Sequence, residues 1–183
     1  VQLRLERALV SWPDDRFVLK TYSPMSPIGG GSISDRAPRK HRGASHAVAA
    51  SLRAVERASG PERVERIVRE AARQGIALEE LVARLGRLRD ETVRDLEASP
   101  GVVRVAAPEP RLYARSVWAS LGDEAVATLK AFHARDPLKD GMSREELRGR
   151  LHLDDAAAAR HLLDELAAAG RVRLLGDLVS LAT

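Results

Sequence analysis

Residues 143–181, SREELRGRLHLDDAAAARHLLDELAAAGRVRLLGDLVSL, decide the fold. Ser143 followed three residues later by Glu146 is a capping box, and it predicts a short helix with Leu147 and Leu151 turned inward. At the other end of the stretch, two short apolar runs at 171–174 and 178–181 flank a turn that contains glycine, which predicts a β-hairpin. A helix between these two elements would complete a compact unit.

The alanine-rich middle of the stretch predicts that helix. Asp154 or Asp155 would cap its start, and Gly170 would end it after Ala169. Its apolar stripe recurs at helical spacing, at Ala159, Leu162, Leu163 and Leu166. A longer helix over 116–135 precedes the stretch and carries Val126, Leu129 and Phe132 on one side.

The same order of elements occurs once before in the chain. An alanine-rich helix over 45–58 leads to a helix over 61–74, a short strand at 76–78, helices over 79–85 and 88–98, and strands at 102–105 and 111–114. Helix, short strand, two helices and a hairpin are the elements of a winged helix. The sequence therefore predicts a mainly α chain with small β-hairpins, in which two winged helices follow each other.

Residues 1–35 have a β pattern instead. Strands are expected at 1–5, 9–10, 16–20 and 28–33, and the glycines 29–31 suit a barrel strand that approaches another backbone closely. We interpret this region as part of a β-barrel, and because its first strand has no neighbours, we expect the chain to be a piece of a longer protein. The predicted boundaries are 1–43 for the partial barrel with a basic connector, 44–115 for the first winged helix and 116–183 for the second.

Composition narrows the possible functions. The 183 residues include no cysteine and only six aromatic side chains, and no run of 18 apolar residues occurs, so we expect a cytoplasmic protein that does not enter membranes. The five histidines show no metal-ligand spacing, and no serine or cysteine nucleophile flanked by glycines is present. The acid pairs 79–80, 145–146 and 154–155 lie at helix starts, where they favour the helix dipole. We expect no catalysis, metal or cofactor in this segment.

Charge indicates where nucleic acid could bind. Residues 1–44 hold eight basic and four acidic side chains, a net charge of +4, whereas 45–115 carry 13 and 11 and 116–183 carry 9 and 11. In a winged helix the third helix enters a groove and the wing touches the backbone. The first winged helix would use arginines at its third helix and in its wing, which are Arg87, Arg89, Arg94, Arg104 and Arg111. Acids alternate with the arginines at this helix, so we favour a solvated mixed-charge face there. In the second winged helix the third helix would repel a phosphate backbone.

The basic connector is the other candidate. It offers four side chains for contacts to an RNA backbone, Arg36, Arg39, Lys40 and Arg42. A flexible solvated linker would have the same composition, and the sequence leaves both interpretations open.

Three blocks of sequence resemble one family. Residues 15–20 (DRFVLK), 28–31 (IGGG) and 38–42 (PRKHR), with 22–24 (YSP) between the first two, look like the end of the third, β-barrel domain of bacterial selenocysteine-specific elongation factors, SelB. Residues 132–133 (FH), 137–138 (PL) and 141–148 (GMSREELR) resemble the second winged helix of the same family.

The resemblance implies partners that the residues alone do not reveal. SelB-like factors bind GTP with Mg²⁺ in an amino-terminal domain, carry selenocysteinyl-tRNA, recognise an mRNA hairpin and act on the ribosome. Their hairpin recognition belongs chiefly to later winged helices, so this segment is expected to be a monomeric spacer with weak RNA binding. Two alternatives remain at this point, a DNA-binding transcription regulator and a purely architectural module.

Overall fold

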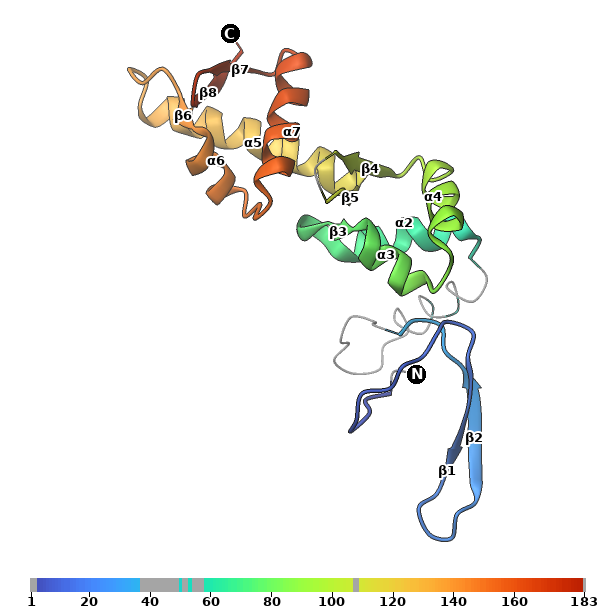
Figure 1. The fold of residues 1–183 in the computed structure, drawn as a ribbon. Coiled ribbons are helices and arrows are strands. Elements are labelled where there is room, and N and C mark those ends of the chain that lie inside the picture. Colours follow the sequence, from blue (N-terminus) through green and yellow to red (C-terminus); the bar gives the residue numbers. More distant parts are fainter. Residues whose placement is uncertain (1–2, 37–49, 51–52, 54–57, 107–108, 183) are drawn as a thin grey trace. The chain divides into compact units, whose positions relative to one another are not determined.

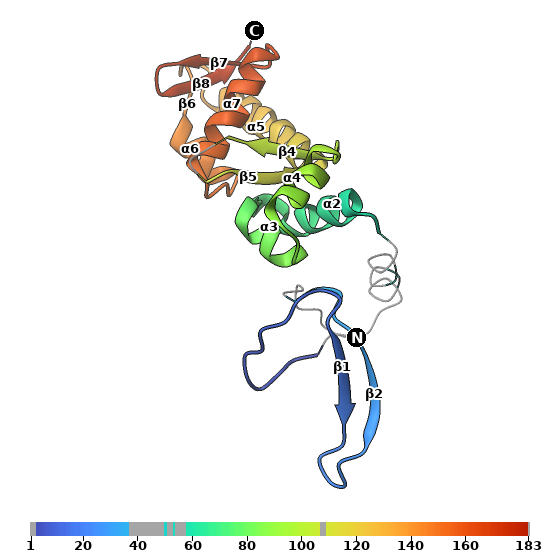
Figure 2. The same cartoon turned by 45° about the vertical axis from the view of Figure 1, so that its right-hand side comes forward.

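The computed structural model describes residues 3–36, 50, 53, 58–106 and 109–182. These form two compact units, Val1–Val64 with Glu79–Ser99, and Glu65–Leu78 with Pro100–Thr183. Figures 1 and 2 show the chain from two directions. The helix expected over 45–58 lies almost wholly outside the described residues, and the three sequence-derived domain boundaries stay predictions.

The first unit contains a β-hairpin and helices. Strands β1 (Arg16–Lys20) and β2 (Pro27–Ser32) pair antiparallel, with Phe17 opposite Gly31 and Val18 opposite Gly30. A Cβ at Gly30 would lie 2.6 Å from the Phe17 carbonyl oxygen, so the glycines allow the close backbone approach that the sequence predicted. Helix α2 (Gly60–Ala71) begins in this unit, and α3 (Leu78–Leu85) and α4 (Arg89–Glu97) belong almost entirely to it.

Two expected strands are wrong. Residues 3–5 and 9–10 are not in strands, and Leu3, Leu5, Leu9 and Val10 are all exposed. A strand needs a neighbour to pair its backbone groups, and among the described residues β1 and β2 pair only with each other. Alternating apolar side chains were therefore not enough to form a strand there.

The second unit contains two three-stranded sheets of the same topology. Strands β3 (Ile76–Ala77), β5 (Arg111–Ala114) and β4 (Val102–Val105) form one sheet in that order. Strands β6 (Met142–Ser143), β8 (Leu178–Leu181) and β7 (Val172–Leu175) form the other. In both sheets the short strand that precedes a helix pairs with the second strand of the hairpin. The repeated order predicted from the sequence is confirmed.

Helices link these sheets. The 21-residue helix α5 (Arg115–Arg135) starts directly after β5, and α6 (Arg144–Arg150) and α7 (Ala156–Ala168) follow β6. A single hydrophobic core joins side chains of β4 and β5, including Val103, Val105 and Tyr113, to α5, α6, α7 and the second sheet. The predicted stripe of α7, from Ala159 to Leu166, lies in that core.

Local sequence signals set the helix ends. The N-cap of α6 is Ser143, whose Oγ accepts a hydrogen bond from the Glu146 N–H at 3.1 Å. The N-cap of α7 is Asp155, whose Oδ1 accepts hydrogen bonds from the N–H groups of Ala157 and Ala158 at 2.8 and 3.3 Å. Helix α2 tightens into a short 3₁₀ helix (Ala72–Gln74), after which Gly75 takes a φ of 61°.

Candidate nucleic-acid interface

The basic connector is represented in the structure by its first residue. Arg36 is exposed, and its guanidinium carbon lies 5.8 Å from the centre of the Trp12 ring, within cation–π range. Arg39, Lys40 and Arg42 lie outside the described residues. One of the four predicted RNA-backbone candidates is thus placed on the surface of the first unit, and the proposed contacts of all four stay a prediction.

Beside Arg36 lies an ion pair that the sequence analysis missed. Arg84 of α3 is 9% exposed, and its Nη2 lies 2.5 Å from Oδ2 of Asp35. A sequence signal was available, because Arg84 falls three residues after Leu81 and thus on the buried stripe of α3. A charged side chain within such a stripe needs a buried partner, since an unpaired charge there would be costly.

The turn before β1 packs near the same end of α3. Gly86 has a φ of 63°, and a Cβ built on it would lie 2.3 Å from Cδ of Pro13 and 3.1 Å from Cε3 of Trp12. The Trp12 N–H donates to Asp15 Oδ2 at 2.8 Å, which holds the turn in shape. The hairpin base and the end of α3 are therefore in contact at two points of the first unit, one polar and one apolar.

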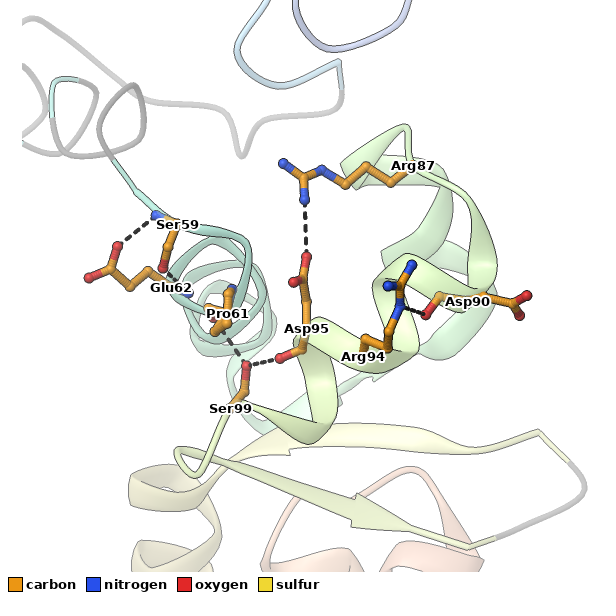
Figure 3. A network of polar contacts seen from close by, with 8 residues as sticks. All are labelled: Ser59, Pro61, Glu62, Arg87, Asp90, Arg94, Asp95 and Ser99. Carbon is orange, nitrogen blue, oxygen red and sulfur yellow. Dashed lines mark hydrogen bonds and ion pairs between the residues drawn. The ribbon is translucent and has the colours of Figure 1, made fainter.

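The arginines around α4 have partners within the unit (Figure 3). Arg87 Nη1 donates to Asp95 Oδ2 at 3.1 Å, and Arg94 Nε donates to the Asp90 carbonyl oxygen at 3.4 Å. Arg89 Nε donates to Glu79 Oε1 at 3.0 Å, in a pair whose two side chains are 58% and 72% exposed. To bind phosphate, these arginines would exchange one anionic or carbonyl partner for another, which lowers the net gain.

Asp95 is the most constrained acid of this group. Its side chain is only 20% exposed, and a Cβ on Gly60 would fall 2.2 Å from its Oδ2. Ser99 Oγ lies 2.7 Å from the Asp95 carbonyl oxygen and 3.2 Å from the Pro61 carbonyl oxygen, so the Ser99 hydroxyl can donate a hydrogen bond to either one (Figure 3). This arrangement holds Asp95 against the first turn of α2 and keeps it available to Arg87.

The start of α2 carries a capping box. The Ser59 N–H donates to Glu62 Oε2 at 2.7 Å, and the Glu62 N–H donates to Ser59 Oγ at 3.4 Å. The hydrogen bond from the Ser59 backbone holds the pKa of Glu62 below its ordinary value. Glu62 is thus ionised as part of a helix cap.

The two arginines of the β4–β5 hairpin differ in environment. Arg111 Nη1 donates to the Gln74 carbonyl oxygen at 2.7 Å, and its Nε lies 3.5 Å from Asp155 Oδ2. Arg104 is exposed on β4 and has no hydrogen bond or ion pair to any other residue that the structure describes. Arg104 alone of the two presents an unpaired guanidinium to solvent.

Metal-ligating clusters and membrane-spanning helices are both absent from the residues that the structure describes. No group of three or more histidine, aspartate or glutamate side chains among them could hold a metal ion. In the same portion of the chain, no helix combines the length and apolar character needed to cross a membrane. The acid pairs 145–146 and 154–155 lie at the starts of α6 and α7, where Ser143 and Asp155 are the caps.

Comparison with known proteins relates this chain to one group of translation factors. A family model described as "Elongation factor SelB, winged helix" matches residues 126–181, from the second half of α5 to β8. A selenocysteine-specific elongation factor from Desulfomicrobium baculatum is 27% identical over 98% of the chain.

Residues 126–181 match the SelB winged-helix family, and the chain as a whole resembles a segment of a SelB factor.

One solved structure shares the fold. The crystal structure of a bacterial selenocysteine-specific elongation factor, EF-Sec, aligns with 98% of the chain at a TM-score of 0.65 and 17% identity. The mRNA-binding domain of SelB from E. coli, solved in complex with SECIS RNA, aligns with 69% of the chain at a TM-score of 0.48 and 12% identity. The alignment covers 99% of that domain. The chain spans 29% of the length of the D. baculatum factor and 27% of EF-Sec. It is therefore similar to one segment of these larger SelB-family proteins, which favours that reading over a DNA-binding regulator.

Proposed function

We propose that this chain is the connecting segment of a factor that carries selenocysteinyl-tRNA to the ribosome with GTP and recognises an mRNA hairpin. GTP and Mg²⁺ would bind outside these 183 residues, and the main contacts with the mRNA hairpin would also lie outside them. The segment would hold the two RNA-handling ends at a fixed separation and bind RNA only weakly itself.

The pairing of Arg87, just before α4, and of Arg89 and Arg94 within α4 carries this proposal. Arg87 and Arg89 are each bonded to a carboxylate and Arg94 to a backbone oxygen, while Asp90 and Glu97 remain exposed on the same helix. Phosphate binding gains its free energy from uncompensated basic side chains that release counterions. A third helix of this kind would contribute little to RNA affinity and would discriminate poorly between sequences.

Weak binding is assigned to the connector. Residues 1–44 carry the whole formal charge of +4, and the rest of the chain is neutral overall. Arg36, Arg39, Lys40 and Arg42 would contact phosphates without reading bases, because contacts of that type position a protein on RNA and carry no sequence information.

Fluorescence anisotropy with a labelled SECIS hairpin tests the division of labour. We expect micromolar or weaker affinity at physiological salt, as is typical of non-specific binding. A hairpin with a scrambled loop should bind equally well. Nanomolar binding that prefers the SECIS hairpin would overturn the spacer assignment, and tight binding to duplex DNA would favour the regulator.

Two matched variants locate the contacts. Replacing Arg39, Lys40 and Arg42 by alanine removes three positive charges, and so does replacing Arg87, Arg89 and Arg94. The plot of log affinity against log salt has a negative slope, and each lost phosphate contact reduces its steepness by about 0.7 to 0.9. The connector variant should therefore lose about two units of slope and the α4 variant almost none, whereas the reverse result would place RNA on α4.

The proposed GTP dependence requires the full-length factor. The full-length protein should hydrolyse GTP and protect selenocysteinyl-tRNA from deacylation in the presence of GTP. A full-length protein without nucleotide binding would contradict the proposed delivery function, and it would leave the RNA-binding result for this segment unaffected.

A further inference from the structure

We infer that the β4–β5 hairpin is a clamp on α7, which joins residues 100–181 into one rigid body and closes the start of α7 to nucleic acid. In a winged helix that reads a groove, the hairpin touches the nucleic-acid backbone and the N-terminal residues of the third helix contact base edges. In this chain the β4–β5 hairpin and the start of α7 contact each other inside the protein instead. The inference goes beyond the proposed function, because it concerns the mechanics of the segment whichever RNA the factor serves.

Apolar packing provides the first part of the clamp. Val103 and Val105 of β4 and Tyr113 of β5 are buried in the same core as Leu162, Leu163 and Leu166 of α7. Figures 1 and 2 both show the hairpin beside α5, and β4 is in contact with α7. A hairpin that packs its inner face against helices in this way cannot move as a separate wing without exposing those side chains to water.

An ion pair provides the second part, at the start of α7. Asp155 uses one carboxylate oxygen to cap α7 and lies with the other 3.5 Å from Arg111 Nε on β5. Arg111 is itself held by the Gln74 carbonyl oxygen at 2.7 Å. The N-terminal end of α7 is therefore occupied by a side chain of the hairpin.

Aromatic side chains provide the third part, further along α7. The rings of Tyr113 and Trp118 lie 5.0 Å apart, and Trp118 Nε1 donates to Glu165 Oε2 at 2.6 Å. Trp118 is 5% exposed and Tyr113 is fully buried. Burial raises the pKa of Tyr113 to about 12, so this ring stays neutral in the core. Through these contacts β5, α5 and α7 hold one another at the middle of α7.

The residues before the hairpin are attached to the same body. Arg73 Nη2 lies 2.6 Å from Glu124 Oε2 on α5, and its Nη1 donates to the Leu151 carbonyl oxygen at 3.2 Å. These two contacts tie the 3₁₀ helix that follows α2 to α5 and to the C-cap of α6. The 3₁₀ helix, β4 and β5 all come before α5 in the chain. Each of them thus contacts an element that follows α5.

Pulsed electron paramagnetic resonance measures the rigidity directly. The chain has no cysteine, so spin labels introduced as Arg104→Cys and Leu175→Cys would be unique, and both positions are exposed. We expect one narrow distance distribution between the two hairpins. A broad or bimodal distribution in the otherwise unchanged protein would overturn the inference.

Hydrogen exchange measures whether the clamp couples the hairpin to α7. Trp118→Phe removes the hydrogen bond to Glu165 but keeps an aromatic ring, and it should raise the exchange rates of β5 and α7 amides together by about tenfold. Asp155→Asn keeps a good helix cap and removes the charge that faces Arg111, and a smaller rise in both elements is expected. Faster exchange in only one of the two elements would show that they open independently.

A control variant isolates the clamp from general charge effects. Glu146 and Arg150 form an exposed pair within α6, and Arg150→Ala removes an ion pair that does not involve the hairpin or the start of α7. This variant should leave β5 exchange and the spin-label distance unchanged. An equal response in the control would mean that the clamp residues have no special role in joining the hairpin to α7.

Discussion

Loss of the Asp35 carboxylate should weaken the attachment of the hairpin base to α3. Asp35→Ala removes the carboxylate that lies 2.5 Å from Nη2 of Arg84, whose side chain is 9% exposed. Breaking a fully buried ion pair from one side costs about 3 to 5 kcal/mol, and an exposed pair is worth about 0 to 1 kcal/mol. Because Asp35 is 23% exposed, water can partly replace it, and we expect a loss of about 2 kcal/mol.

Hydrogen exchange of α3 peptides gives this free energy locally. A loss of about 2 kcal/mol corresponds to an approximately 30-fold faster exchange of α3 amides that open with this contact. Arg84→Met removes the buried charge itself and refills the site with an apolar chain, so it should cost less than Asp35→Ala. If Arg84→Met proved the more damaging variant, or if neither changed α3 exchange, the buried pair would not hold α3. The exposed pair between Arg89 and Glu79 is the control, and Glu79→Ala should have little effect.

Four further variants test individual features. Gly86→Ala should destabilise the first unit by more than 1 kcal/mol in urea unfolding, because φ is 63° and the new Cβ would lie 2.3 Å from Pro13 Cδ. Gly149→Ala, on an open helical site in α6, should instead stabilise by up to about 1 kcal/mol. Tyr113→Phe should keep or raise the melting temperature, because the buried hydroxyl has no hydrogen-bond partner among the described residues; a clear loss would reveal a hidden partner. The lowered pKa of Glu62 means that its helix cap stabilises α2 above the ordinary glutamate pKa and is lost as the pH falls through the lowered value; Glu62→Gln should remove that acid dependence of α2 exchange.

Local sequence signals predicted the second unit well. Strands β4 and β5 have the predicted bounds, and α7 begins after one of the two aspartates named as possible caps. These elements follow from short-range rules, because caps, glycine stops and apolar spacing each act within one or two helical turns. The repeated topology then followed from the order of elements.

The predicted strands at the amino terminus failed for a non-local reason. Alternation at residues 3–5 indicates a face that could be buried, but a strand forms only when another strand pairs with it. The described residues provide no such partner, and the leucines there are exposed. Local pattern alone does not contain that information.

The candidate site shows the same limit. Sequence spacing placed the α4 arginines beside acids on the same helix, but the carboxylates bonded to Arg89 and Arg111 come from α3 and from the cap of α7. Such pairs depend on how elements separated by 10 to 44 residues pack together, which charge counting cannot reveal. Net charge directs attention away from the second winged helix, which stays a prediction, and the individual ion-pair partners required the fold.

The direct junction between β5 and α5 has a consequence for the length of this segment. No residue separates the last position of the strand, Ala114, from the first position of the helix, Arg115. One residue inserted into α5 would lengthen the helix by about 1.5 Å and also rotate everything beyond it by about 100° around the helix axis. Reach and direction are therefore linked in α5, and only insertions near whole numbers of turns, such as seven residues, would extend the segment while keeping its far end facing the same way.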